Sequence, residues 1–136
     1  MSREIPQPSD LENALALADK AWRSGSSEQD LREGLAHCER ALESIRQTGD
    51  FLDIGDLPVR LQLARGHLYE ALGMGNEALQ SYQAAINGWQ ELDQKTPGRF
   101  AVELAGVWMN CGNVLRKWGA APVLTEAVRA YDRCVT

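Results

Sequence analysis

The sequence lacks the features of an exported or membrane-bound protein. Its first ten residues contain charged side chains and two prolines, without the apolar stretch of a signal peptide. No apolar run approaches the roughly 20 residues that cross a bilayer. Cysteine is scarce: Cys38, Cys111 and Cys134 are odd in number, lie far apart and form no C-x-x-C pair. We therefore expect reduced thiols in a cytoplasmic protein without a membrane segment.

An excess of positive charge is also missing. The 14 Lys and Arg residues are outnumbered by 19 Asp and Glu residues, which gives a formal net charge of −5. The phosphate surface of a nucleic acid would repel such a chain unless its basic residues were segregated. They are instead interspersed with acidic residues, as in 28–33. We therefore expect no nucleic-acid partner.

Catalytic and metal-binding patterns are absent too. The sequence contains no Ser/His/Asp constellation, no glycine-rich phosphate loop after a strand and no short Cys/His ligand spacing. His37 and Cys38 are adjacent, but neighbouring residues on a helix point about 100° apart, so they do not face each other. We expect Cys38 in the core. The sequence predicts neither an enzyme nor a cofactor or metal site.

Helical periodicity fills most of the chain. In one segment Ala78, Leu79, Tyr82, Ile86 and Trp89 fall at helical spacing, and no segment alternates for long enough to predict a strand. We expect a linker at 49–56 and six helices, at residues 9–24, 28–48, 57–73, 76–94, 97–118 and 122–135.

Three of these helices begin with residues that suit a helix start. Ser9 and Glu12 match a capping box, in which each side chain satisfies an exposed backbone N–H. Asn76 is placed to cap the helix at 76–94. Thr96 precedes Pro97, the pattern of a cap followed by proline in the first helical position.

Three glycines, Gly25, Gly73 and Gly119, recur at intervals of 48 and 46 residues. A small residue lies seven positions before each glycine. The helix that follows each glycine carries a small residue, then a larger one, then another small one, at helical spacing. The preceding small residues are Ala18, Gly66 and Gly112, and the later sets are Gly34, Cys38, Ala41; Ala78, Tyr82, Ala85; and Ala127, Tyr131, Cys134. This repetition predicts tandem helical hairpins that stack through small residues.

The middle unit resembles a tetratricopeptide repeat, in which small and aromatic residues fit together between two helices. The matching residues are Gly66, Tyr69, Ala78, Tyr82 and Ala85. The third unit is similar in Trp108, Gly112, Leu115, Ala127 and Tyr131, with three extra residues in its turn. The first is similar in Ala18, Ala21, Gly34, Cys38 and Ala41, with four extra residues. The period overlaps that of HEAT-type repeats, about 40–47 residues, but the residue set of the middle unit favours the tetratricopeptide family.

The resemblance implies an all-α fold. We expect one domain over 1–136, a right-handed solenoid of three antiparallel helical hairpins at 9–48, 57–94 and 97–135. Solenoids need a terminal cap with a polar outer face. The sequence ends soon after Tyr131, so we expect either self-association through an uncapped C-terminal hairpin or a longer native chain.

In this family the first helix of each hairpin lines a concave groove. The positions that match are Met109, Asn110, Asn113, Arg116 and Lys117 in the third unit, Arg60, Leu63, His67 and Glu70 in the second, and Glu12, Leu15, Asp19 and Arg23 in the first. The string from Asn110 to Asn113 is similar to the family's Asn-Leu-Gly-Asn pattern, whose amides hold a ligand's backbone. The alternative is two solvated asparagines on an exposed face. The family's two-carboxylate clamp is not matched, because Leu15 and Asp19 occupy its first-unit positions.

The expected function is a non-catalytic protein–protein interaction module, an adaptor or scaffold. Its groove would bind a peptide or helix of a partner, and Arg60, Arg116 and Lys117 would favour acidic side chains. The alternative is a regulatory or sensor segment of a larger enzyme or transcription factor that binds a ligand in the groove. The remaining aromatic candidates are tryptophans: we expect Trp89 and Trp108 in the core, and Trp22 and Trp118 either packed or exposed for binding.

Overall fold

The computed structural model describes residues 8–24, 27–48 and 55–118. These ranges contain five helices and no strand, which confirms the all-α prediction. The helices are α1 (Pro8–Arg23), α2 (Glu28–Thr48), α3 (Leu57–Ala71), α4 (Gly75–Lys95) and α5 (Ala101–Trp118). The expected helix at 122–135 and the glycines Gly25 and Gly119 lie outside the described residues.

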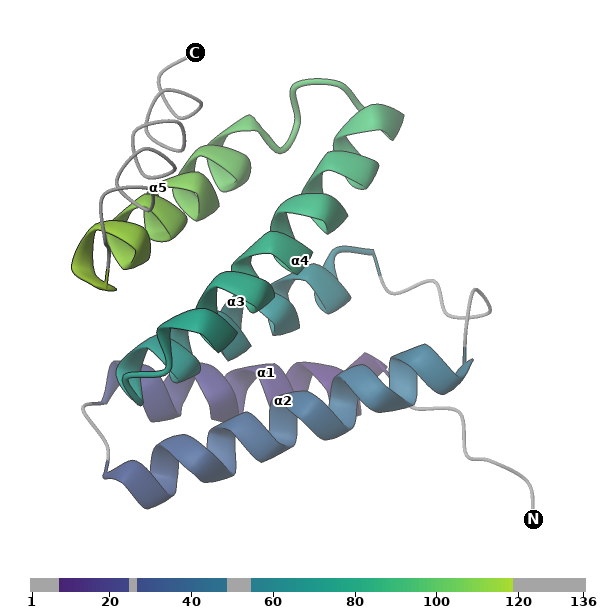
Figure 1. Cartoon of the computed structure of the whole chain (residues 1–136). Helices are drawn as coiled ribbons and strands as arrows, with labels where there is room; N and C mark the ends of the chain where they lie inside the picture. Colours follow the sequence, from purple (N-terminus) through teal and green to yellow (C-terminus); the bar gives the residue numbers. More distant parts are fainter. Residues whose placement is uncertain (1–7, 25–26, 49–54, 119–136) are drawn as a thin grey trace.

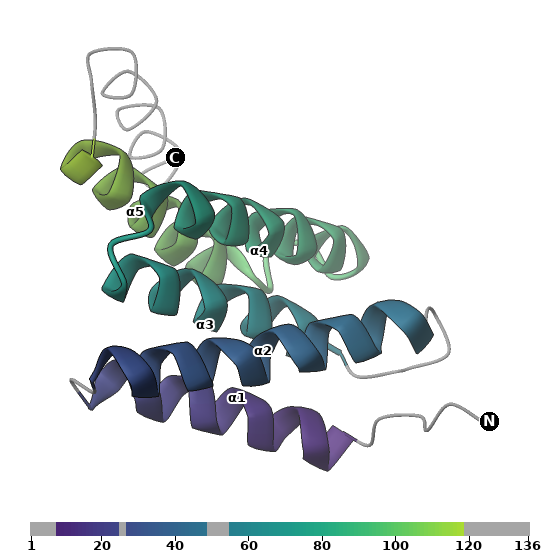
Figure 2. The same ribbon diagram turned by 60° about the horizontal axis from the view of Figure 1, so that its bottom comes forward.

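Helices that follow one another in the chain pack against one another. The contacts join α1 to α2, α2 to α3, α3 to α4 and α4 to α5, and α1 also contacts α3. Both ribbon views place the α1/α2 pair at one end and α5 at the other, with α3 and α4 between them (Figures 1 and 2). The contact of α1 with α3 brings the first helices of two successive pairs onto a common face.

Small residues allow the paired helices to approach closely. A Cβ added at Gly34 of α2 would lie 2.9 Å from the Cβ of Ala21 in α1. In the next pair, a Cβ at Gly66 of α3 would lie 2.5 Å from the ring of Tyr82 in α4. Tyr82 is fully buried, as its aromatic position in the repeat pattern predicts. Both pairs therefore close over a glycine at a position that the repeat pattern reserves for a small residue.

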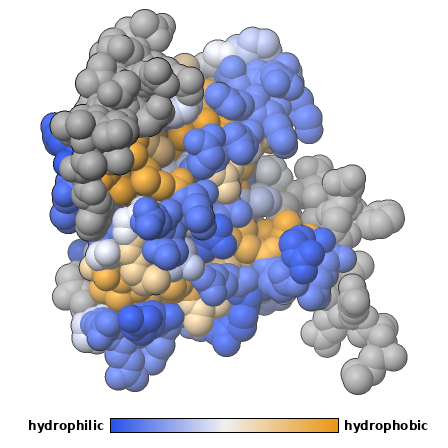
Figure 3. Space-filling model, viewed as in Figure 1, coloured by the Kyte–Doolittle hydropathy of each residue, from blue (hydrophilic) through white to orange (hydrophobic). Residues whose placement is uncertain are grey.

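The core consists of two clusters that meet at α3. Leu61 and Leu68 of α3 pack with residues of α1 and α2 in the first cluster. Val59 of α3 packs with residues of α4 and α5 in the second, while Tyr69 contacts both clusters. The face of the molecule in Figure 3 shows apolar areas between larger polar ones.

The end of α3 is a glycine-dependent turn. Gly73 has a positive φ of 76°, which side chains disfavour. The N–H of Gly73 donates to the carbonyl of Glu70 at 3.0 Å, and the N–H of Met74 donates to that of Tyr69 at 2.8 Å. This pair of bonds is a Schellman motif, which satisfies carbonyls at the helix end and turns the chain back into α4.

The capping predictions were wrong in detail. Because α4 begins at Gly75, its N-cap is Met74 and Asn76 lies inside the helix. Ser9 lies inside α1, which begins one residue earlier than predicted. The Thr96–Pro97 start is also wrong, since α5 begins at Ala101. The carboxylate of Asp93 explains the delay: its Oδ1 accepts from the N–H groups of Gly98 at 3.0 Å and Phe100 at 3.3 Å. These bonds hold the connection in a turn before α5 begins.

None of the helices in the described ranges combines the length and apolar character that a membrane crossing requires.

Candidate functional site

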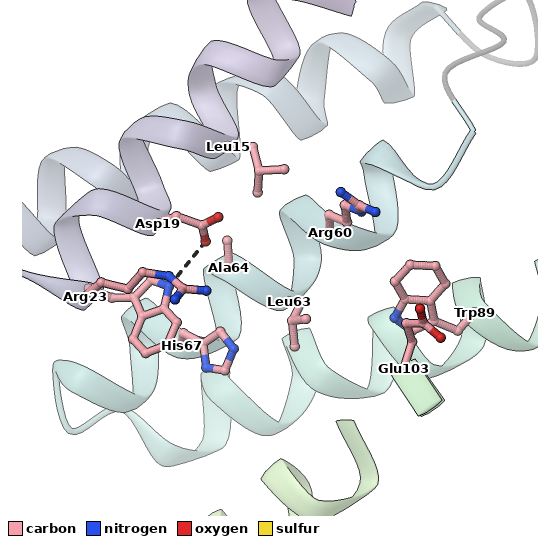
Figure 4. A pocket seen from close by; sticks show the side chains of 10 residues that line it. Leu15, Asp19, Arg23, Arg60, Leu63, Ala64, His67, Trp89 and Glu103 are labelled. Atoms are coloured by element: carbon pink, nitrogen blue, oxygen red, sulfur yellow. Dashed lines mark hydrogen bonds between the residues drawn. The ribbon is translucent and has the colours of Figure 1, made fainter. Parts of the chain in front are cut away.

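A pocket of about 270 Å³ opens on the face that α1 and α3 share. One residue of α4 and one of α5 complete its wall. Figure 4 shows the lining side chains, which are Leu15, Asp19, Trp22 and Arg23 of α1, Arg60, Leu63, Ala64 and His67 of α3, Trp89 of α4 and Glu103 of α5. The volume lies just below the roughly 300–1,000 Å³ of pockets for drug-sized ligands. The pocket therefore suits a small group rather than a whole nucleotide.

One end of the pocket is a stack of flat side chains. The rings of Trp22 and His67 lie 4.3 Å apart, tilted by 22°. The guanidinium of Arg23 lies 5.0 Å from the Trp22 ring, close enough for a cation–π interaction. The indole Nε1 of Trp22 donates to Asp19 Oδ1 at 3.3 Å (Figure 4). The Nε1 atom of Trp22 therefore has a hydrogen-bond partner. The stacking of Trp22 on His67 joins α1 to α3.

His67 is fixed from behind by a buried tyrosine. The hydroxyl of Tyr82 donates to Glu70 Oε2 at 2.8 Å and lies 3.1 Å from His67 Nδ1. Because the hydroxyl has a single hydrogen, His67 Nδ1 is the donor in the second bond. This leaves Nε2 of the neutral ring as an acceptor. The sequence spacing alone does not predict this His–Tyr–Glu chain, which joins α3 to α4.

Burial governs the ionisation of both groups. Burial lowers the pKa of His67 below its usual value, and the charge of Arg23 lowers it too, while Glu70 and Asp19 act in the opposite direction. Burial also raises the pKa of Tyr82 well above its usual range, and the bond to Glu70 adds to the rise. At neutral pH the pocket therefore contains a neutral imidazole backed by a neutral phenol.

The other end of the pocket is formed where α3 crosses α4. A Cβ at Gly88 would lie 2.6 Å from Val59 Cγ2, so the helices are in close contact at this point. Arg60 follows Val59 in α3, Trp89 follows Gly88 in α4, and both line the pocket. The ring of Trp89 also packs on Phe100, with centroids 4.9 Å apart.

Trp89 has a buried donor without a bond. Only 2% of the residue is exposed, as its predicted core position requires. Its indole Nε1 has no hydrogen-bond partner within the described part of the chain. Leaving a buried N–H unpaired costs about 1–3 kcal/mol. A group that accepts from this atom would recover that cost.

The charges around the pocket balance. Arg23 and Arg60 contribute two positive charges, and Asp19 and Glu103 contribute two negative charges. Arg60 is already paired, since its Nε donates to Asp56 Oδ2 at 2.9 Å. With His67 neutral, the lining side chains carry no net charge, and the Asp56 carboxylate adds one negative charge beside them, which disfavours an anionic ligand group.

The residues predicted for the groove fall into two groups. Arg60 and His67 line the pocket, together with the other predicted positions Leu15, Asp19, Arg23 and Leu63. The α5 candidates Met109, Asn110, Asn113, Arg116 and Lys117 do not line it and lie further along the helix. The predicted positions Glu12 and Glu70 do not line it either.

Asn110 is the α5 candidate best aligned with the pocket. It lies seven residues after Glu103, which is two helical turns on nearly the same face of α5. Asn113 Oδ1 accepts from Arg116 Nη2 at 3.1 Å, so these side chains interact on the helix surface. Met109 is 47% exposed.

Three lining residues were not predicted as binding residues: Ala64, Trp89 and Glu103. Trp89 was assigned to the core alone, although it lies on the apolar face of α4 and its edge reaches the pocket. Glu103 had no assignment, and it lies in the first turn of α5. Its position follows from the late start of that helix, which no local motif indicates. The side chain of Trp118 lies outside the described residues.

The thiols that the structure describes are core residues. Cys38 is fully buried, as predicted, and burial raises the pKa of its thiol to about 12, with the charge of Asp19 adding to the rise. This thiol is therefore not a nucleophile at neutral pH. Over residues 8–24, 27–48 and 55–118, no cluster of three His, Cys, Asp or Glu side chains could hold a metal ion.

Comparison of the chain with protein-family models, with curated proteins and with solved structures finds no match in any of the three.

Proposed function

We propose that this chain is a tetratricopeptide-like protein interaction module that binds an extended segment of a partner protein along the face of α1, α3 and α5. One observation carries the proposal: the pocket collects side chains from α1 and α3, and α5 adds Glu103 to its wall. In a stack of helical hairpins, side chains of the first helices form a continuous surface, which is how such stacks present a binding face.

The pocket is one position on this longer surface. From Glu103 to Asn110 the rise along α5 is about 10 Å, at about 1.5 Å per residue. About three residues of extended chain cover that length. A bound segment with one residue in the pocket would therefore bring its backbone close to Asn110 three residues later. An amide is suited to that contact because it donates and accepts at once.

The binding of a small molecule by a regulatory segment is the second candidate. The observation in its favour is the pocket itself, which is small and has a buried, unpaired donor in its wall. A free ligand of matching size would occupy the pocket alone, without contacts to the distal part of α5. Variants of Asn110 therefore separate the two candidates.

The experiment selects binding peptides from a random displayed library, using the folded chain as bait. Calorimetry then compares Arg60→Ala with Arg32→Ala. These two arginines are matched: both are exposed and both form an ion pair with a carboxylate one turn earlier, Arg60 with Asp56 and Arg32 with Glu28. Only Arg60 lines the pocket.

We expect Arg60→Ala to weaken a selected peptide about 3- to 10-fold, since charge-assisted contacts at an exposed rim contribute about 1 kcal/mol. Arg32→Ala should leave the affinity within about twofold, because an exposed pair far from the ligand contributes little. Asn110→Ala should weaken a peptide but not a small ligand. Equal effects of the two arginine variants, or a library that yields no binder, would contradict the proposed function.

A further inference from the structure

Trp89 contributes the one feature of the pocket that packing alone does not explain. An indole N–H that is buried without a partner is unusual in a folded protein, because nearly all buried polar groups form hydrogen bonds. The neighbouring tryptophan of the same pocket shows the ordinary arrangement: Trp22 Nε1 donates to Asp19. Within the described ranges Trp89 Nε1 has no such acceptor, although its side chain forms part of the pocket wall.

The surroundings of Trp89 define what can bind there. The inner surface between the two aromatic ends consists of Leu15, Leu63 and Ala64, which offer apolar contact and no hydrogen bonds (Figure 4). The rim has no excess positive charge to hold an anion, and the hydrogen-bond donor of Trp89 calls for an acceptor, which a cation does not supply. The ligand group must therefore combine an aliphatic part with a neutral hydrogen-bond acceptor, and it must fit in about 270 Å³.

We propose that the pocket recognises one aliphatic residue of a partner polypeptide, whose side chain packs on Leu63 and whose backbone carbonyl accepts the hydrogen bond of Trp89 Nε1. This inference rests on the proposed function and names the residue class that the pocket selects. An amide carbonyl is neutral and a strong acceptor, and it lies a few bonds from the side chain that fills the apolar space. A free carboxylate would bring a negative charge into the pocket, and the rim has no excess positive charge to pair with it.

Glu103 is the lining residue whose movement would open a path to the donor. It is exposed and lines the same pocket as Trp89 (Figure 4). Because Trp89 Nε1 is buried, part of the pocket wall must move when the carbonyl enters, and we assign this movement to the exposed side chain of Glu103. An exposed glutamate on the first turn of a helix can change rotamer at little cost.

The primary test uses the unmodified chain labelled with ¹⁵N. Each of its four tryptophans gives one indole N–H signal, and the signal missing from Trp89→Phe identifies Trp89. The probes are two blocked tripeptides, acetyl-Gly-Leu-Gly-amide and acetyl-Gly-Gly-Gly-amide. We expect the leucine probe to move the Trp89 signal downfield with a Kd of about 1–10 mM, as for a flexible ligand that buries one side chain and forms one hydrogen bond. The glycine probe should bind at least about tenfold more weakly, because it lacks the buried aliphatic group.

The variants refine the assignment. Trp89→Phe keeps a large aromatic ring and removes the donor, so it should weaken the leucine probe about 5- to 100-fold. The matched control is Trp108→Phe, the same substitution at a partly buried residue that does not line the pocket, and it should change the Kd by less than about twofold. Glu103→Ala should bind the probe at least as tightly as the unmodified chain.

Three results would overturn the inference. In the first, the Trp89 signal does not move with the leucine probe. In the second, both probes move it equally. In the third, Glu103→Ala moves it in the free protein while the probe does not, which would make Glu103 the partner of Trp89. If library peptides bind and shift backbone signals of α1 and α3 without moving the Trp89 indole, the inference fails and the proposed function stands. If no peptide shifts any signal, the proposed function itself fails.

Discussion

Replacing Gly66 by alanine tests whether the close contact of α3 with α4 holds this fold together. The added Cβ would lie 2.5 Å from Tyr82 Cε1 and 2.6 Å from Cδ1, so something must shift. The ring cannot move freely, because Tyr82 is fully buried and its hydroxyl is bonded to Glu70 and lies beside His67. Separating the helices is the remaining response, and overpacking of this kind costs about 1–3 kcal/mol or more.

An opposite effect acts at the same position. Alanine is favoured over glycine in a helix by about 1 kcal/mol, because it loses less conformational freedom on folding. The net expectation for Gly66→Ala is a decrease of about 1–2 kcal/mol in the free energy of unfolding. Gly106 provides the matched control: it is an exposed residue inside α5, and a Cβ added there meets no described atom within 4 Å. Gly106→Ala should therefore stabilise the chain by about 0.5–1 kcal/mol.

The assay is urea denaturation followed by circular dichroism at the helical signal. The slope of the transition must stay constant between variants for the comparison to hold. Opposite signs for the two substitutions are the predicted result. If Gly66→Ala stabilises the chain as much as Gly106→Ala does, the contact between Gly66 and Tyr82 is not close in solution and the packing described above is wrong.

Two further predictions concern titrating groups. Because the pKa of His67 is lower in the folded chain than in the unfolded one, the unfolded state binds more protons as the pH falls through about 6.5, and stability should decrease below that pH. His67→Gln should make the stability fall less steeply at low pH, as measured by urea titrations at several pH values. If the variant shows the same pH profile as the unmodified chain, His67 does not cause the loss of stability. Burial and the raised pKa of the Cys38 thiol, about 12, predict that iodoacetamide alkylates this residue only after denaturation. Peptide mass spectrometry measures the modification, and rapid native labelling of Cys38 would contradict its core position.

The sequence was sufficient to predict the fold class and most helix positions, because apolar spacing and glycine positions are local signals. Gly66 and Tyr82 are an example. The repeat pattern predicted a small residue at the first position and an aromatic residue at the second, and in the structure the two positions are in close contact. The start of α5 was missed because its determinant, Asp93, acts on Gly98 and Phe100 from the preceding helix. The residues at 96–97 carry no signal of these bonds, because the acceptor lies in the preceding helix.

The site was less accessible from sequence. The positions taken from the tetratricopeptide resemblance included most pocket residues of α1 and α3 but not Trp22 or Ala64, since register predicts a helix face but not which neighbouring side chains reach it. The unpaired donor of Trp89 could not be predicted, because an unsatisfied atom is a property of three-dimensional surroundings. The same holds for His67, whose tautomer depends on Tyr82 and Glu70 lying behind it.

The most direct test of the central claim is a map of backbone amide shifts in the ¹⁵N-labelled chain on titration with a library-selected peptide. If the face of α1, α3 and α5 binds the partner, the largest shifts should fall on residues around the pocket, including Arg60 and His67, and extend along α5 to Asn110. Shifts concentrated instead on the outer faces of α2 and α4, with the pocket residues unmoved, would contradict the account.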